Sequence, residues 1–413
     1  MRNLKLSRSL AVGVLLLWSG VALAQYERPP NFAAGKIPGI KIGDENYSIQ
    51  DPVHSDGLLR VYTLGTPYGD LGVHGDQMVK MRIIELAALR ELEKISGSES
   101  FGKALAEAGL SPLKYTGRLI TNPAQTINDT FSGIGNFSGI GNMFGRIGAN
   151  MNNMGKTNEN AVASLLGVTD QKRQLAARFG VDPYTDYEPL SAKLDRLSEA
   201  AASGGLTVRG ALLAVPGAAG IVVSNLATAN RLGDTKIEDL ARDYTVAQIM
   251  DLNRQRLKAM DVDPELTEAL LVNRNYTPID IAATVASLDS MAVVGERKLF
   301  FQQAQAARSR ELAYFTRKRA EMLAAHRASL TQFIMLGGYP FNLTRDGRVV
   351  GIMPVDALAW TENTGKSLSD AAADAKRLTP NARGELRISG QVTPMARQRL
   401  KALGWTVVEN VKF

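Results

Sequence analysis

The 413-residue chain contains no cysteine and only three histidines. The absence of cysteine excludes disulfide bonds, thiolate metal sites and cysteine nucleophiles. The scarcity of histidine limits imidazole chemistry to His54, His74 and His326. The overall composition, with 45% hydrophobic and 22% charged residues, is that of a globular protein that can form a sizeable core.

Several sequence motifs of enzymes are also missing. The chain has no Gly-x-Ser-x-Gly nucleophile turn, no phosphate-binding P-loop, no His-Glu-x-x-His zinc helix and no strand-linked Gly-x-Gly-x-x-Gly turn. We therefore expect no cofactor, and the sequence favours a non-catalytic protein over an enzyme.

The first 24 residues have the three parts of a secretory signal peptide. Three positive charges come first, an apolar stretch runs from Leu10 to Val21, and Ala22-Leu23-Ala24 is a small-x-small cleavage site. We expect export by a Sec-type route with cleavage between Ala24 and Gln25, and a periplasmic or secreted protein.

Charge of one sign is only slightly in excess. Removal of the signal peptide takes away three positive charges and lowers the formal net charge from +7 to +4. A mildly basic protein suits an anionic membrane surface or an envelope protein partner, but this excess is too small to indicate nucleic-acid binding. No feature of the sequence fixes the oligomeric state.

The most unusual segment is a glycine-rich repeat at 129–155. The hexapeptide Phe-Ser-Gly-Ile-Gly-Asn occurs twice in tandem and is followed by a frayed third copy. Steps of three and four place large apolar residues on one helical stripe: Phe131, Ile134, Phe137, Ile140, Phe144 and Ile147.

Glycine opposes that helix, because each interior glycine costs about 1 kcal/mol relative to alanine. Charge is nearly absent between Arg118 and Lys156, where only Asp129 and Arg146 are ionised. One interpretation is an interfacial helix ordered by a membrane surface or by a protein partner. The alternatives are a flexible glycine loop and a tightly packed buried helix.

A second unusual feature is a basic segment from Glu296 to Leu336. It carries Arg317, Lys318 and Arg319 beside an apolar face, which predicts a long amphipathic helix that is broken near Ser309. This helix could contact a membrane or a partner, or it could present an ordinary solvated face over a helical core.

Local signals predict many of the other elements. Asp76 to Lys94 reads as a helix followed by Gly97, and Thr277-Pro278-Ile-Asp280 is a capped helix start. Two similar segments, which end in Val181-Asp182-Pro183 and Val262-Asp263-Pro264, each predict a helix end with a buried valine beneath it.

Strands are expected near both ends of the chain. Residues 58–64 and 70–74 form a hairpin around a Pro-Gly turn, and 341–345 pairs with 348–353 through Asp346-Gly347. A polar linker at 361–383 is followed by a strand, a helix and a strand that ends at 411. We expect this β-α-β unit to pair with the second hairpin or with the N-terminal strands.

The expected fold class is therefore mainly α, with a multi-helix body closed by one small mixed sheet built from both ends of the chain. The corresponding divisions are a signal peptide (1–24), an extended arm and hairpin (25–75), a helical body (76–336) and a small α+β region (337–413).

The best enzyme candidates are two His-x-Asp units. The first is His54-Ser-Asp56 and the second is His74-Gly-Asp76, which follows Asp70 in or beside the same hairpin. A neutral imidazole nitrogen with a carboxylate suits a divalent metal or a general base. The alternative is that the aspartates are ordinary turn and cap residues, as Asp76 is at its helix start.

Three functions follow from these features. The first is an exported, non-catalytic module that binds a membrane surface or a protein partner through 129–155 and the basic helix. The second is a metal-dependent or general-base hydrolase that uses His54 and His74. The third is a membrane-inserting protein that combines 129–155 with the uncharged segment 210–230, although a buried helix–turn–helix is the favoured structure for that segment.

Overall fold

The computed structural model describes residues 25–96, 170–202, 231–232, 235–380 and 383–412. About 49% of this part is helical and 20% is strand, and it holds two separate multi-strand sheets. The repeat at 129–155 and the uncharged segment 210–230 lie outside the described residues. Among the helices that are described, none is long and apolar enough to cross a bilayer.

The N-terminal sheet is antiparallel and local in sequence. Its strands are β1 (Ser48–Ile49), β2 (His54–Ser55), β3 (Arg60–Thr66) and β4 (Gly69–His74). Strands β3 and β4 form the predicted hairpin, and β1 and β2 pair with the other side of β3. A single turn, η1 (Ala34–Lys36), precedes the sheet. Helix α1 (Asp76–Ser96) leaves β4 directly and begins at the predicted residue.

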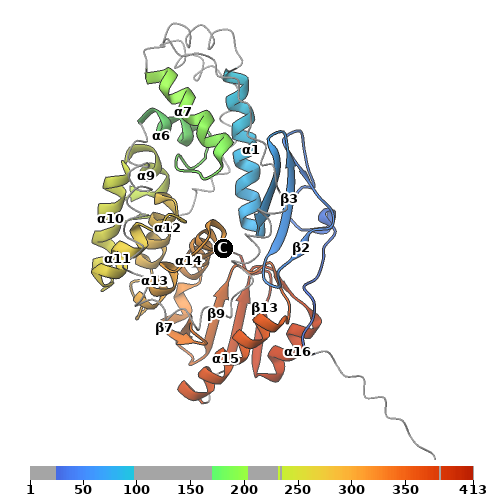
Figure 1. Ribbon diagram of the computed structural model, residues 1–413. Helices are drawn as coiled ribbons and strands as arrows, with labels where there is room; N and C mark the ends of the chain where they lie inside the picture. The colour runs from blue at the N-terminus through green and yellow to red at the C-terminus, as the bar shows by residue number, and fades with distance from the viewer. Residues whose placement is uncertain (1–24, 97–169, 203–230, 233–234, 381–382, 413) are drawn as a thin grey trace, which may run out of the picture.

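The helical part packs beside α1 (Figure 1). Its helices are α6 (Asp170–Arg178), α7 (Glu188–Ala202), α9 (Ile237–Asp243), α10 (Val246–Ala259), α11 (Pro264–Leu271), α12 (Pro278–Asp289), α13 (Lys298–Ala304) and α14 (Arg310–Ala325). The short strands β5 (Arg231–Leu232) and β6 (Thr235–Lys236) pair just before α9.

The second sheet lies at the C-terminal end of the chain and has the strand order β13-β11-β9-β8-β7. After the turn η2 (Arg327–Ser329), the chain runs through β7 (Leu330–Leu336), β8 (Tyr339–Thr344), β9 (Val349–Met353), β10 (Ala357–Leu358), α15 (Glu362–Leu378), β11 (Gly384–Ile388), β12 (Gln391–Val392), α16 (Pro394–Ala402) and β13 (Trp405–Val408). Strands β10 and β12 form a separate parallel pair.

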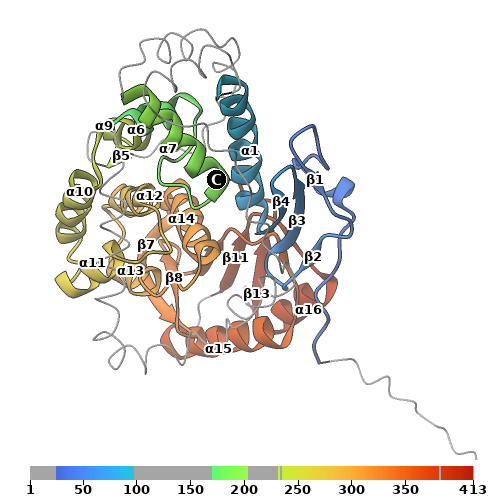
Figure 2. The ribbon, with the colours of Figure 1, turned by 45° about the horizontal axis from the view of Figure 1, so that its top comes forward.

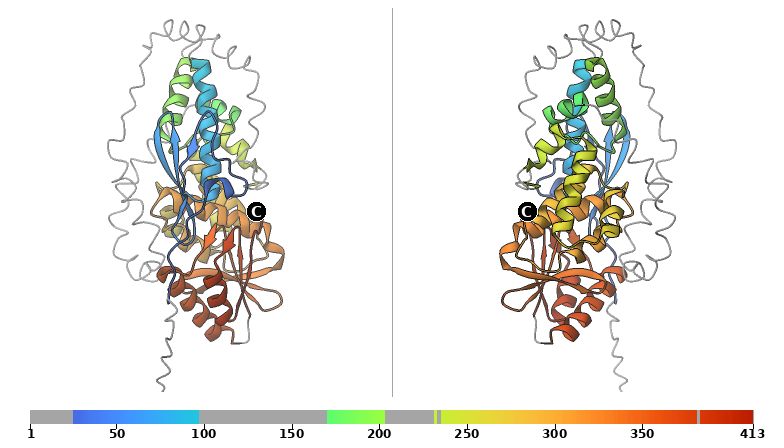
Figure 3. Two further views of the ribbon diagram at one scale, coloured as in Figure 1. Left: turned by 90° about the vertical axis from the view of Figure 1, so that its right-hand side faces the viewer. Right: turned by 90° about the vertical axis from the view of Figure 1, so that its left-hand side faces the viewer.

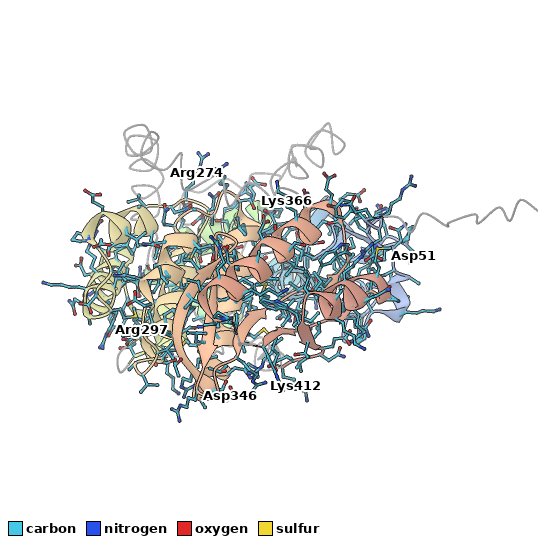
Figure 4. All side chains as sticks on the ribbon, turned by 90° about the horizontal axis from the view of Figure 1, so that it is seen from below. Asp51, Arg274, Arg297, Asp346, Lys366 and Lys412 are labelled. Carbon is cyan, nitrogen blue, oxygen red and sulfur yellow. The ribbon has the colours of Figure 1, made fainter. Side chains whose placement is uncertain are left out.

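The C-terminal sheet is covered on both faces. One face, which includes Phe333, Val350 and Ile352, joins the apolar cluster of the helical part. The other face packs under α15 and α16, which form the outer layer in Figures 2 and 4. The N-terminal sheet forms a third cluster with α1, α6 and α7. Helices α1 and α7, cyan and green, extend to the end of the molecule opposite α15 and α16 (Figure 3).

The expectation of one small mixed sheet is wrong, because the two ends of the chain build two sheets. The β11–α16–β13 unit does pair with the second hairpin, since β11 lies parallel to β9 and β13. The N-terminal hairpin does not join that sheet. Its apolar face packs instead on α1, the helix that follows directly in the chain. This face is therefore covered without a strand from the C-terminal region.

Two other predictions are also corrected. Residues 330–336 form strand β7 rather than the end of a long helix, because the turn at Gly337-Gly338, with both φ angles positive, folds them onto β8. The expected linker at 361–383 contains α15, whose alanine-rich face packs on the sheet. The break near Ser309 is present, and Ser309 caps α14.

The two Asp-Pro segments end their helices in the same way. Gly180 and Asp261 have positive φ, and the next residue in each case, Val181 or Val262, donates its N–H to a carbonyl five residues back. This is the Schellman pattern, which satisfies free carbonyls at a helix end. Both valines are buried, as predicted.

The first residues after the expected cleavage site contact the C-terminal region. The Glu27 carboxylate accepts hydrogen bonds from the Trp360 N–H at 2.6 Å and from the Thr393 hydroxyl. Thr393 caps α16, and Trp360 directly precedes the cap of α15. The negative charge of Glu27 therefore lies at two helix N-termini, where it is favoured.

We expect Glu27→Ala to lower the free energy of unfolding by about 1.5–3 kcal/mol, the range for hydrogen bonds to a charged group. Urea denaturation monitored by tryptophan fluorescence measures this change. Arg28→Ala, at the exposed neighbouring residue, is the control and should have almost no effect. Equal stabilities of the two variants would contradict this role of Glu27.

Candidate binding site

A cavity of about 260 Å³ lies among α10, the end of α11, the start of α12 and the loop 184–186. We call it the α10–α12 cavity. Its walls are mainly apolar, because Val246, Ile249, Leu271 and Ile281 all line it. Its size is just below the range of about 300–1,000 Å³ that is typical of sites for drug-sized ligands.

The loop between α11 and α12 forms one wall and is held firmly. The Asn273 side chain donates hydrogen bonds to the carbonyls of Gln305 and Ala307 at 2.9 and 3.0 Å. Asn275 also donates to Ala307, at 2.9 Å, and the Tyr276 hydroxyl donates to the carbonyl of Ala304 at 2.8 Å. The loop is thereby fixed to the end of α13.

The opposite wall, loop 182–186, is also fixed. Asp182 accepts hydrogen bonds from the Tyr184 N–H at 2.9 Å and from the Thr277 hydroxyl at 2.6 Å. The Thr185 hydroxyl donates to Glu85 of α1 at 2.5 Å. Both walls of the cavity are therefore preorganised, which reduces the entropy cost of binding.

An alternating series of charged side chains connects loop 182–186 to the helices behind it. Neighbours in the series are 2.5–3.0 Å apart, and the order is Glu85, Arg82, Asp186, Arg310, Asp280, Arg317, Glu321 and Lys318. We call this the ion chain. It joins α1, α12 and α14, and most of its members are buried.

The charges of the ion chain set the protonation of its carboxylates. Burial raises the pKa of Asp280, but Arg310 and Arg317 outweigh burial and the pKa is lowered. At Asp186, burial likewise raises the pKa, but Arg82 and Arg310 outweigh burial and the pKa is lowered to about 2. Both groups are ionised near neutral pH.

Asp182 behaves in the opposite way. Burial and the nearby charge of Asp280 raise its pKa to about 6. The folded state therefore binds this proton more tightly than the unfolded state, in which the pKa is 3.8. The contribution of Asp182 to stability is most favourable below pH 4, is lost as the pH rises to 6, and changes by up to about 3 kcal/mol.

We expect Asp182→Asn to remove this dependence, so that the variant gains stability relative to the unmodified protein as the pH rises from 4 to 7. Urea denaturation at intervals of half a pH unit measures the difference. Asp186→Asn is the control and should lose stability at neutral pH, because Arg82 and Arg310 lose an ionised partner. Parallel curves for Asp182→Asn and the unmodified protein would contradict the assignment.

Three polar groups of the cavity lining have no hydrogen-bond or ion-pair partner among the described residues, and one of them is the buried hydroxyl of Tyr184. Asn253 on α10 is 1% exposed, and its Oδ1 atom has no hydrogen-bond partner among the described residues. Arg274, between the anchored Asn273 and Asn275, is exposed and forms no ion pair within the described part of the chain. Figure 4 shows its side chain at the periphery of the molecule.

The four hairpin residues predicted from sequence do not form one site. His54 and His74 flank Val61 from opposite sides of β3. His54 is exposed, and its Nδ1 lies 3.0 Å from the side-chain oxygen of Asn31. Asp70 accepts a hydrogen bond from Gln50 at 3.2 Å.

The remaining pair, Asp56 and His74, is close enough to interact electrostatically. Burial lowers the pKa of His74, against the charges of Glu311 and Asp56. Asp56 is a turn residue, as the alternative interpretation of the sequence held. Its carboxylate accepts hydrogen bonds from the N–H groups of Leu58 and Leu59 at 2.8 and 2.7 Å. No cluster of three or more potential metal ligands occurs in the described residues.

The basic residues of α14 are not on the surface. Arg317, Lys318 and Arg319 are 2%, 8% and 0% exposed. The first two belong to the ion chain. Arg319 donates to the carbonyls of Ile352 and Pro340, and its guanidinium lies 4.2 Å from the centre of the Tyr339 ring. These three side chains are unavailable to a membrane surface in this structure.

The other predicted contact residues fall outside the described residues. They are Phe131, Ile134, Phe137, Ile140, Phe144 and Ile147.

Sequence reasoning missed Asn253 and Arg274. Asn253 lies four residues from both Ile249 and Leu257, so its spacing places it on the buried face of α10, and this signal could have found it. A signal was present for Arg274, since an Asn-Arg-Asn run between two helices predicts a structured turn. Comparisons of the chain with protein-family models, with curated proteins and with solved structures find no match.

Proposed function

We propose that the chain is an exported, non-catalytic interaction protein that takes up an apolar group of its partner in the α10–α12 cavity. The observation that supports this proposal is the cavity itself, with its apolar walls and an unpaired polar atom in Asn253. Such a combination of an apolar enclosure with few polar groups is typical of binding sites.

The anchoring of both walls further supports binding. The hydrogen bonds of Asn273 and Asn275 and those of Asp182 and Thr185 fix the backbone on either side of the opening. An interior that served only for packing would be filled, because protein cores are close-packed. A cavity between two fixed loops therefore favours a role in recognition.

Fluorobenzene, observed by ¹⁹F NMR, tests the proposal. Its resonance should shift or broaden in the presence of the protein, because a small apolar probe can enter the cavity. Met250 lines the rim and is only partly buried, so Met250→Trp should fill the opening and abolish the effect.

The matched control is Leu266→Trp, at a partly buried position of α11 that does not line the cavity. It should bind fluorobenzene as the unmodified protein does. The proposal fails if the unmodified protein does not bind, or if both tryptophan variants bind equally. Export is tested separately by N-terminal sequencing of the mature protein, which should begin at Gln25.

A further inference from the structure

Some polar atoms around the α10–α12 cavity have hydrogen-bond partners within the protein, and others have none. Thr185 and Asn273 use their side chains in hydrogen bonds that hold the walls, and the Asp186 carboxylate receives Arg82 and Arg310. Two buried atoms of the described lining residues have no hydrogen-bond partner, the Asn253 Oδ1 and the Tyr184 hydroxyl, and Asn253 Oδ1 is the one that can only accept. A buried acceptor without a donor is unfavourable, so a ligand that brings a donor gains affinity there.

Two charged residues line the cavity, Asp186 and Arg274. The carboxylate of Asp186 is matched by two arginines, whereas Arg274 has no acidic partner among the described residues. Arginine binds carboxylates through two parallel hydrogen bonds, which adds geometric specificity to charge attraction. The loop that carries Arg274 is already fixed by Asn273 and Asn275.

The space between these two groups is small and apolar. A volume of about 260 Å³ with walls such as Ile249, Leu271 and Ile281 suits one aromatic ring system rather than a long chain. Aromatic groups with a polar N–H or O–H at one edge combine a large apolar surface with one hydrogen bond.

Building on the proposed function, we propose that the cavity recognises an acidic aromatic group, in which a ring N–H or O–H donates to Asn253 and an adjacent carboxylate pairs with Arg274. This chemistry has two sources. One is a free aromatic acid, and the other is a tryptophan or tyrosine next to an acidic residue in a protein partner.

Titration calorimetry with indole-3-propionate tests the chemistry, because this probe has the ring, the N–H and the carboxylate. Its N-methyl derivative lacks the donor, and its primary amide lacks the charge. We expect each change to weaken binding to the full mature protein by about tenfold, the usual effect of losing one such interaction.

Two variants assign these losses to residues. Asn253→Leu should bind the N–H and N-methyl probes equally, and Arg274→Gln should bind the acid and the amide equally. Arg345→Gln, at an exposed arginine in the turn between β8 and β9, is the matched control and should discriminate as the unmodified protein does. If Asn253→Leu fails to fold, the affinities of the unmodified protein for the three probes still show whether the N–H and the carboxylate contribute to binding.

The source is distinguished with acetyl-Trp-Glu-amide. Binding at least tenfold tighter than that of indole-3-propionate indicates a protein segment, and the reverse order indicates a free acid. Equal affinity for the acid, the amide and the N-methyl probe overturns this inference while fluorobenzene binding is retained. Absence of fluorobenzene binding overturns the proposed function itself.

Discussion

Replacement of Asp280 by alanine is expected to lower the free energy of unfolding by about 3–5 kcal/mol, the range for removing one partner from a buried ion pair. Asp280 is 0% exposed and accepts from Arg310 at 2.5 Å and from Arg317 at 3.0 Å. Its removal leaves the buried guanidinium of Arg317 and the largely buried one of Arg310 with one acidic partner fewer each. It also removes the acceptor of the Thr277 N–H at the start of α12.

Urea denaturation near neutral pH measures the loss. Asp251→Ala is the matched control, because the Asp251–Arg254 pair is 2.7 Å apart but both side chains are exposed, and Arg254 keeps its contact with Glu268. Exposed pairs contribute about 0–1 kcal/mol. A loss below about 1.5 kcal/mol for Asp280→Ala would show that water replaces the missing carboxylate and that the ion chain is not a rigid support.

Gly390→Ala is the second substitution with a large expected effect. A Cβ atom at this position would lie 1.9 Å from the carbonyl oxygen of Asp356 and 2.4 Å from its carbonyl carbon. The neighbouring atoms belong to the backbone, so no side-chain rotation relieves the overlap. The β10 and β12 segments, which are held here by the Gln391 N–H to Asp356 carbonyl bond of 3.0 Å, would have to separate.

We expect Gly390→Ala to destabilise the protein by about 3 kcal/mol or more, at the upper end of the effects of overpacking. Thermal unfolding and limited proteolysis of the C-terminal region measure it. Gly72→Ala in β4 is the control, since a Cβ atom there meets nothing within 4 Å, and it should be neutral or slightly stabilising. Similar melting temperatures for the two variants would contradict the close approach of the two segments.

The local elements were largely predictable, because their signals lie within a few residues of each other. Thr277 and Asp280 form the complete capping box at the start of α12, with Pro278 in the first turn. Gly347 has the positive φ that the Asp-Gly turn requires. The helix ends at Val181 and Val262 also repeat as expected.

The pairing of distant elements was not predictable. The strand at 330–336 reads as part of an amphipathic helix in isolation, and it becomes β7 only because the Gly337-Gly338 turn returns the chain alongside it. The hairpin 60–74 carries no information about whether its partner is α1 or the C-terminal sheet. That choice depends on which apolar surface is nearer once the chain has folded.

The site shows the same division. The histidines stood out by their rarity, yet His54 and His74 lie on opposite sides of β3, and the aspartates near them serve turns and exposed contacts. Asn253 and Arg274 drew no notice as single residues. They gain meaning only because α10 and the 273–276 loop enclose the same cavity.

By itself the sequence determined the excluded cysteine chemistry, the capped helix starts and the tight turns, because each rests on covalent composition or on contacts between near neighbours. Only the tertiary structure decided that Arg317, Lys318 and Arg319 are buried and that Asp280 joins Arg310 to Arg317. The physical reason is that the environment of a charge depends on the elements packed around it. A basic stripe on α14 looks the same in sequence whether water or Asp280 faces it.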